Sequence, residues 1–74
     1  MAKTYLKNCN YNLANQLVKK LKFLWVADGL IADAKRDGHK DCEKMWHIIK
    51  KDEEKHAEML RKQLIKKIKK DEFS

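Results

Sequence analysis

Two side chains of types that commonly bind metals, Glu53 and His56, stand three positions apart in the second half of the chain. In a helix, residues three apart project from the same face and lie one turn apart. A carboxylate and an imidazole arranged in this way can both bind iron or another divalent metal. Asp28 is a third candidate, because it is an acidic residue within an otherwise apolar stretch. The sequence therefore offers Glu53, His56 and Asp28 as candidate metal ligands.

The sequence shows no pattern typical of nucleophilic catalysis or of phosphate binding. It has no glycine-rich phosphate loop, and no Ser or Cys placed to work with a His and an Asp. The other two histidines, His39 and His47, are expected at the surface. We therefore expect a protein that is not an enzyme.

The composition is that of a small helical domain with a positive net charge. The chain has 74 residues, no proline, two glycines and a net charge of +7, and its 43% apolar content is too high for a disordered tail. No uncharged apolar run is longer than residues 23–27, so we expect neither a transmembrane span nor a secretion signal. Cys9 and Cys42 lack the spacing of a zinc site, and reduced thiols in a cytoplasmic protein are the expected state.

Residues 36–39 mark the one strong break in the helical pattern. Gly38 suits the left-handed residue that follows a helix, and Lys35 and Arg36 precede it, where positive charge is favoured. We predict one helix over about 10–37, a turn at 37–40 and a second helix over about 40–70. Residues 1–74 then form a single all-α domain, an antiparallel two-helix hairpin.

Apolar residues recur at helical spacing in both predicted helices, which predicts the faces that pack together. The stripe of the first helix consists of Leu6, Leu13, Leu17, Leu21, Leu24 and Ile31. The stripe of the second helix consists of Cys42, Met45, Trp46, Ile49, Leu60 and Leu64. We expect these stripes to pack together, with Asp28, Glu53 and His56 as polar interruptions on the inward side.

The first helix carries more apolar residues than one neighbouring helix can cover. Residues 23–32 are apolar almost all round, because several large side chains lie on further faces: Phe23, Trp25, Val26 and Leu30. Large exposed apolar patches usually mark interfaces. We therefore predict that these four residues form the interface of a homodimer, in which two hairpins make a four-helix bundle.

A resemblance to rubrerythrin and ferritin-like hairpins is carried by one run in the second helix, Asp52-Glu53-Glu54-Lys55-His56-Ala57-Glu58-Met59-Leu60. The length of the hairpin and the position of its turn fit the same resemblance, over roughly residues 12–70. The resemblance implies a ferritin-like four-helix bundle that single hairpins complete by pairing. It also implies that Glu53 and His56 correspond to iron ligands of a di-iron carboxylate site.

The sequence departs from that family on the first helix. The family also has an inward Glu there at the height of Glu53, but residues 18–23 contain no carboxylate, and Lys20 is their inward polar residue. We favour a degenerate site without a cofactor, in which Lys20, Glu53 and His56 form a structural polar cluster. The alternative is a composite site across the dimer. There, Asp28 of one copy would join Glu53 and His56 of the other to bind iron or another divalent metal.

A different class of function is suggested by lysines gathered at the open end of the hairpin: Lys3, Lys7, Lys19, Lys20, Lys22, Lys62, Lys66, Lys67, Lys69 and Lys70. Such an end attracts phosphates without sequence specificity. The chain has no helix-turn-helix spacing and only two arginines, so weak nucleic-acid binding is kept as an alternative. The function that we predict is self-assembly of a small non-enzymatic hairpin through its apolar faces, without a membrane partner.

Overall fold

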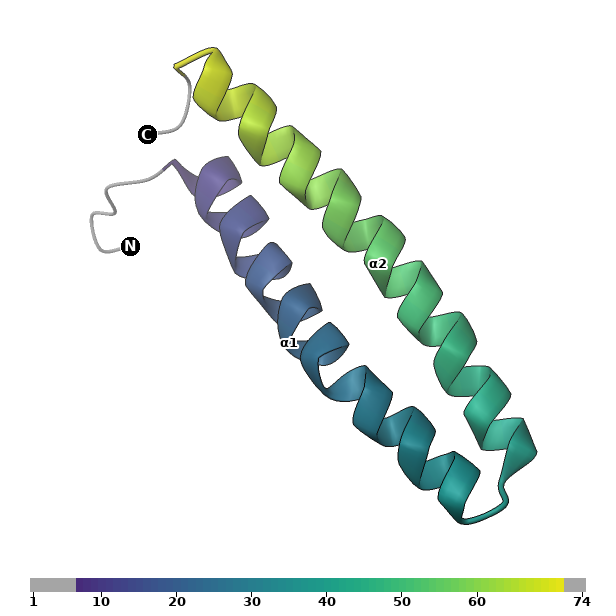
Figure 1. The fold of residues 1–74 in the computed structure, drawn as a ribbon. Helices are drawn as coiled ribbons and strands as arrows, with labels where there is room; N and C mark the ends of the chain where they lie inside the picture. Colours follow the sequence, from purple (N-terminus) through teal and green to yellow (C-terminus); the bar gives the residue numbers. More distant parts are fainter. Residues whose placement is uncertain (1–6, 72–74) are drawn as a thin grey trace.

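The computed structural model describes residues 7–71, which form two long helices joined by a tight turn (Figure 1). Helix α1 spans Asn8–Arg36 and helix α2 spans Lys40–Lys69. The helices pack side by side and run in opposite directions, and residues 7–71 contain no strand. The predicted all-α antiparallel hairpin is therefore confirmed, with helix bounds close to those expected from the sequence.

The turn is held by backbone hydrogen bonds around Gly38. This glycine has a φ of +76°, a left-handed conformation that is costly for residues with a β-carbon. The His39 N–H donates to the Ala34 carbonyl at 2.9 Å, and the Gly38 N–H donates to the Lys35 carbonyl at 3.2 Å. These are the two bonds of a Schellman motif, which satisfies carbonyl groups at the end of α1 and reverses the chain.

The residues that pack the helices together recur at alternating spacings of three and four. The central buried and half-buried residues of α1 are Asn10, Leu13, Leu17, Lys20, Leu24, Ala27, Ile31 and Ala34. Those of α2 are Glu43, Trp46, Lys50, Glu53, Ala57, Leu60, Leu64 and Lys67. This spacing is the seven-residue repeat of a two-stranded coiled coil, and we call these residues the inner seam. Leu6, predicted for the same stripe, lies outside the described residues.

Among the described residues, the buried positions of the inner seam are three alanines and Asn10. Ala27, Ala34 and Ala57 are 1%, 7% and 8% exposed, and Asn10 is 1% exposed. The small alanine side chains allow the two helices to approach closely, because the distance between packed helices depends on the side chains at the contact. The rings of Phe23 and Trp46 also pack together, with their centroids 6.5 Å apart.

Three apolar residues that the sequence pattern placed between the helices are exposed instead. Leu21 is 51% exposed and Met45 is 43% exposed, and Cys42 also lies at the surface. The neighbouring seam positions are taken by the polar residues Lys20 and Glu43. The prediction was wrong at these positions because it ranked faces by hydropathy, whereas the seven-residue spacing of the seam decides which residues point inward.

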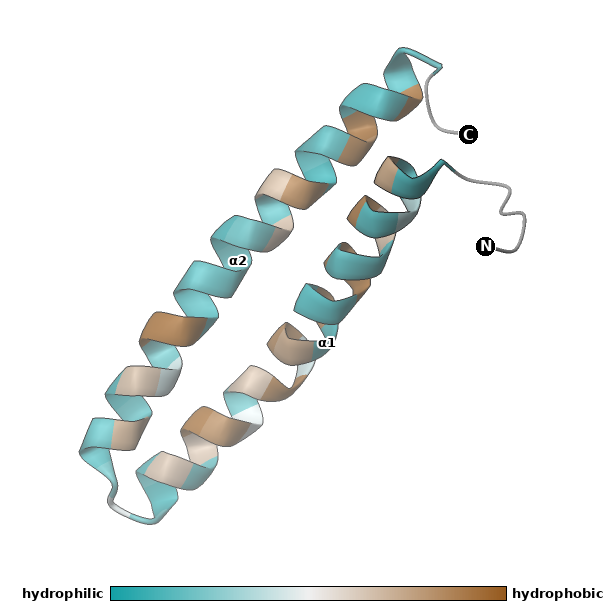
Figure 2. Cartoon of the chain, turned by 180° about the vertical axis from the view of Figure 1, so that it is seen from behind, coloured by the Kyte–Doolittle hydropathy of each residue, from teal (hydrophilic) through white to brown (hydrophobic). Residues whose placement is uncertain are grey.

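The hairpin is a single layer of two helices. Its Cα trace measures 49 × 26 × 13 Å. Its radius of gyration is 16.3 Å, against roughly 11 Å expected for a compact domain of this length. Many large apolar side chains are therefore exposed: Tyr11, Val18, Leu21, Trp25, Val26, Met45, Ile48, Met59, Ile65 and Ile68. Hydrophobic colour dominates the half of α1 nearest the turn, whereas α2 is mostly hydrophilic (Figure 2). Neither helix, as far as the structure describes it, has an apolar stretch that could cross a membrane.

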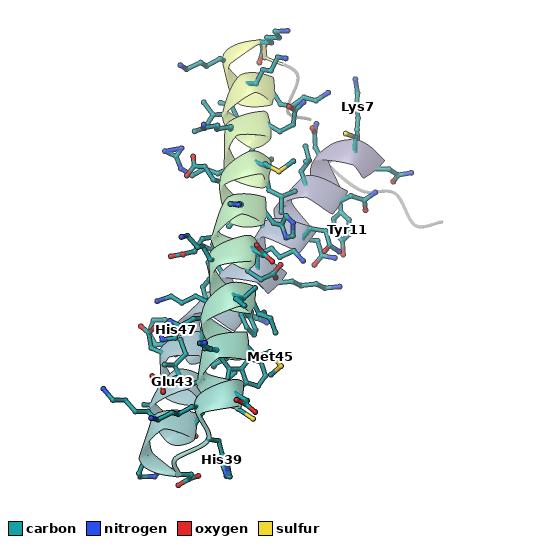
Figure 3. The ribbon with its side chains drawn as sticks, turned by 90° about the vertical axis from the view of Figure 1, so that its right-hand side faces the viewer. Lys7, Tyr11, His39, Glu43, Met45 and His47 are labelled. Atoms are coloured by element: carbon teal, nitrogen blue, oxygen red, sulfur yellow. The ribbon has the colours of Figure 1, made fainter. Side chains whose placement is uncertain are left out.

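The hairpin presents two different faces to solvent. In the edge-on view of Figure 3, His47 projects to one side of α2 and Met45 projects to the other. The same view shows that the helices cross at an angle rather than lying parallel, as expected for helices that wind around a common seam. His47 and Met45 therefore lie on opposite faces of the hairpin.

Candidate functional site

Lys20 and Glu53 form an ion pair across the inner seam. The Lys20 Nζ atom lies 3.3 Å from Glu53 Oε2, and the two side chains are 29% and 18% exposed. Both residues occupy seam positions, so their helices direct them toward each other. The sequence analysis expected these two residues to meet, and the structure brings them together.

His56 extends this ion pair toward the surface. Its Nδ1 atom lies 2.9 Å from Glu53 Oε1, and the carboxylate can only accept, so the imidazole N–H is the donor. The spacing of three along α2 places the imidazole one turn from the carboxylate. The His56 side chain is 54% exposed, so the expectation of a histidine bonded within the core is wrong in its location. His56 lies beside the inner seam because the seam positions of this part of α2 belong to Glu53 and Ala57.

The pKa of Glu53 is held below its ordinary value. The hydrogen bond from His56 is the largest cause, and the hydrogen bond and charge of Lys20 act in the same direction. Partial desolvation of the carboxyl group opposes them. A carboxyl with a lowered pKa is ionised at neutral pH and is poorly suited to donate protons there. The cluster is therefore suited to holding charge in place rather than to acid catalysis.

Asp28 lies apart from this cluster and has its own partner. The Lys50 Nζ atom donates to Asp28 Oδ1 at 2.7 Å, and the Asp28 side chain is 78% exposed. This hydrogen bond is the largest cause of a raised pKa for Lys50. The expectation that Asp28 points inward is wrong, because Ala27 occupies the adjacent seam position and turns Asp28 toward the surface. Within one chain, Asp28 does not join Glu53 and His56.

The metal hypothesis is not met by one hairpin alone. Within residues 7–71, no group of three or more His, Cys, Asp or Glu side chains is placed to hold a metal ion. Each Glu53 oxygen already has a partner, with His56 on Oε1 and Lys20 on Oε2. A divalent cation at this carboxylate would have to displace or repel the Lys20 ammonium group. A composite site across two copies stays a prediction.

An open hollow of about 460 Å³ lies beside the cluster and toward the open end of the hairpin. Both helices contribute its lining, which consists of Leu13, Gln16, Lys20, His56, Met59, Leu60 and Gln63. The sequence analysis did not single out the two glutamines or Met59. Gln63 could have been found from the seven-residue spacing. It follows His56 by seven positions and therefore lies on the same side of α2. The residues that line the hollow include no Ser, Thr or Cys, and Lys20 and His56 contribute its ionisable groups.

The predicted interface residues divide into two groups. Trp25 and Val26 are 88% and 49% exposed, so they are accessible to a second chain. Phe23 and Leu30 are half-buried, and the Phe23 ring packs on Trp46 within the hairpin. The expected interface therefore includes residues that already support the fold of the single chain. Tyr11, Val18 and Leu21 are also exposed, although the sequence analysis did not assign them to the interface.

Three comparisons with known proteins found no relative of this chain. No protein-family model matches the sequence, and no significant match was found among curated proteins or among solved structures.

Proposed function

We propose that this chain is a small non-enzymatic helical hairpin that acts by associating with a second copy of itself into a ferritin-like four-helix bundle. The single observation that carries the proposal is the exposure of Trp25, at 88%, among further exposed apolar residues on the same helix. A tryptophan contributes one of the largest apolar surfaces of any side chain, and monomeric proteins rarely leave such patches uncovered.

The exposed apolar side chains of α1 support the same proposal. Within the described residues, five large ones are exposed on this helix: Tyr11, Val18, Leu21, Trp25 and Val26. Monomeric proteins rarely expose large contiguous apolar patches. The described part of the hairpin therefore has apolar surface that a second copy can cover.

The polar cluster has a structural role in this proposal. Lys20 supplies the positive charge that a metal ion would otherwise bring to Glu53, and His56 donates to the remaining oxygen. Such fully partnered polar groups fix which residues face each other across a helix pair. We propose that the cluster is a metal-free counterpart of a carboxylate–histidine site.

Sedimentation at micromolar concentration tests the self-association. We expect a dimer or a larger assembly, and a well-folded monomer would contradict the proposal. Elemental analysis of protein purified without an affinity tag tests the second part. Iron, manganese or zinc near one equivalent per chain would overturn the metal-free role of Lys20 and favour the composite metal site.

A further inference from the structure

Four of the five large exposed apolar residues described on α1 follow one line along the helix, and Val26 lies beside it. Tyr11, Val18, Leu21 and Trp25 are 52%, 49%, 51% and 88% exposed. With half-buried Ala14 they have spacings of three, four, three and four, the same alternation that packs α1 on α2. We call these five residues the outer seam. A groove of about 500 Å³ lies along it, lined by Val18, Leu21, Lys22, Trp25 and Val26.

The outer seam lies at the angle expected for a second helix neighbour. Each of its residues directly follows a residue of the inner seam, as Tyr11 follows Asn10 and Val18 follows Leu17. One residue along an α-helix corresponds to a rotation of about 100°. The outer seam therefore faces nearly at right angles to the contact with α2. Each helix of a four-helix bundle contacts two neighbours at about this angle.

The geometry points to the outer seam of a second copy as the occupant, with the two α1 helices antiparallel about a two-fold axis at Val18. This inference rests on the proposed self-association and names the surface that performs it. Val18 is the middle residue of the outer seam. A two-fold axis there sets Trp25 level with the partner's Tyr11, and Leu21 within one residue of the level of the partner's Ala14. Large residues then meet small ones, and rings meet rings.

Helix α2 offers no comparable surface within its described residues. Its exposed apolar side chains are interrupted by charged residues and are Met45, Ile48, Met59, Ile65 and Ile68. The outer seam of a second copy therefore has the residue spacing that matches this outer seam, whereas the described part of α2 does not. A surface that matches itself forms a two-fold symmetric contact.

The charges favour the antiparallel orientation. A parallel pair would place Lys22 against the partner's Lys22, at the edge of the groove, whereas the antiparallel pair places it level with the partner's Ala14. The parallel pair would also bring together the two basic ends of α2, which carry Arg61, Lys62, Lys66, Lys67, Lys69 and Lys70. Like charges at such short distances are destabilising.

Helix α2 adds a complementary contact in this arrangement. The Lys20–Glu53 pair shows that Val18 lies level with residue 55 of α2. Glu58 and Leu21 line one groove, so this part of α2 lies on the same face as the outer seam. Lys51 precedes Glu58 by one seven-residue repeat and shares that side of the helix. A two-fold axis at Val18 brings Lys51 nearly level with the partner's Glu58.

Val18 and Met59 provide a pair of test positions on the two helices. Both are exposed apolar residues, at 49% and 68%, but Met59 lies on α2 and lines neither of the two grooves beside Leu21. Val18→Lys should raise the dimer dissociation constant about a hundredfold, because both copies lose the burial of a valine. Met59→Lys should change it by less than about tenfold. Circular dichroism on both variants checks that the hairpin stays folded.

Disulfide formation tests the symmetry axis directly. In a Cys9→Ser/Cys42→Ser background, Val18→Cys should give a covalent dimer under mild oxidation, because residues on the axis come close enough to bridge. Val26→Cys should stay uncoupled. A dimer that responds equally to both positions would overturn the outer-seam contact and leave self-association standing. A monomeric wild-type chain would overturn both. Binding of that monomer to phosphatidylserine vesicles, lost in Trp25→Lys, would assign the outer seam to a lipid surface instead.

Discussion

Lys50 of α2 donates a 2.7 Å hydrogen bond to Asp28 of α1, and this pair has the opposite charge order to the nearby Lys20–Glu53 pair. In one pair the cation belongs to α2, and in the other it belongs to α1. A slide of α2 by one seven-residue repeat would remove both pairs, and in one direction it would set Glu43 beside Asp28. The two pairs together therefore favour a single alignment of the helices.

The first prediction concerns the coupling between Lys20 and Glu53. Because both side chains are less than one-third exposed, a double-mutant cycle with Lys20→Ala and Glu53→Ala should give a coupling of about 0.5–1 kcal/mol. Urea unfolding measures the free energies. Glu54→Ala is the control on the neighbouring exposed position, and it should stay within about 0.5 kcal/mol of the wild type. A coupling of zero would mean that the pair contributes no stability.

The second prediction is a loss of stability in acid. The folded pKa of Glu53 lies below the unfolded value near 4.5. Its stabilising contribution is therefore complete above that value and is lost as the pH falls through the folded pKa. Unfolding free energies measured from pH 6 down to about pH 3 should fall for the wild type. In Glu53→Gln the fall should be smaller, and an identical fall in both proteins would contradict this assignment.

The third prediction compares the two glycines. Gly38→Ala should destabilise the hairpin by about 1 kcal/mol, because its φ of +76° is strained for alanine. Gly29 lies inside α1 with open space around it, so Gly29→Ala should stabilise the helix by about 0.5–1 kcal/mol. Thermal unfolding followed by circular dichroism measures both changes. Equal effects at the two positions would show that the turn does not depend on Gly38.

The fourth prediction concerns the close approach of the helices. Ala57→Leu should cost about 1–3 kcal/mol, because the added carbons have to fit where the residue is only 8% exposed. Ala32→Leu places the same change on the exposed side of α1 and should be nearly neutral. Denaturant unfolding distinguishes the two. A stabilising Ala57→Leu would show that the inner seam has unfilled space.

The fifth prediction concerns the lysines at the end of α2. Lys66, Lys67 and Lys69 lie in its last turn, where positive charge favours the helix itself. Any binding to duplex DNA should therefore be weak, independent of sequence and steeply reduced by salt. Fluorescence anisotropy between about 50 and 300 mM salt measures it. Sequence-selective binding that persists at the higher salt concentration would make nucleic-acid recognition the better proposal.

The helical hairpin was predictable because its signals are local. Gly38 marks the turn, and the missing prolines and the charged residues around the turn define both helices. The Lys20–Glu53 contact was also predictable, since counting back from a turn of known position gives the level of each residue on the opposite helix. Gly38 thus gives the position of the turn, and counting from it gives one contact of the polar cluster.

The inward faces were less predictable because polar residues occupy them. Lys50 and Glu43 lie in the inner seam, whereas Leu21 lies outside it. A hydropathy pattern assigns apolar residues to the inside. In this hairpin, ion pairs between the helices also determine which residues face inward. Asp28 was assigned inward for a related reason, since its Lys50 partner can be recognised only once the helices are aligned.

The Schellman turn also has a consequence for the order in which the hairpin folds. Only residues 37–39 separate the two helices, so closing this loop costs little chain entropy. Once Ala34 and Glu43 lie near each other, each further layer of the inner seam is adjacent to one already formed. Folding can then proceed as a zipper from the turn outward, with mostly short-range steps of the kind that make helical proteins fold fast. Asn10 and Lys67, at the far end of the seam, are the last to join and the first to separate.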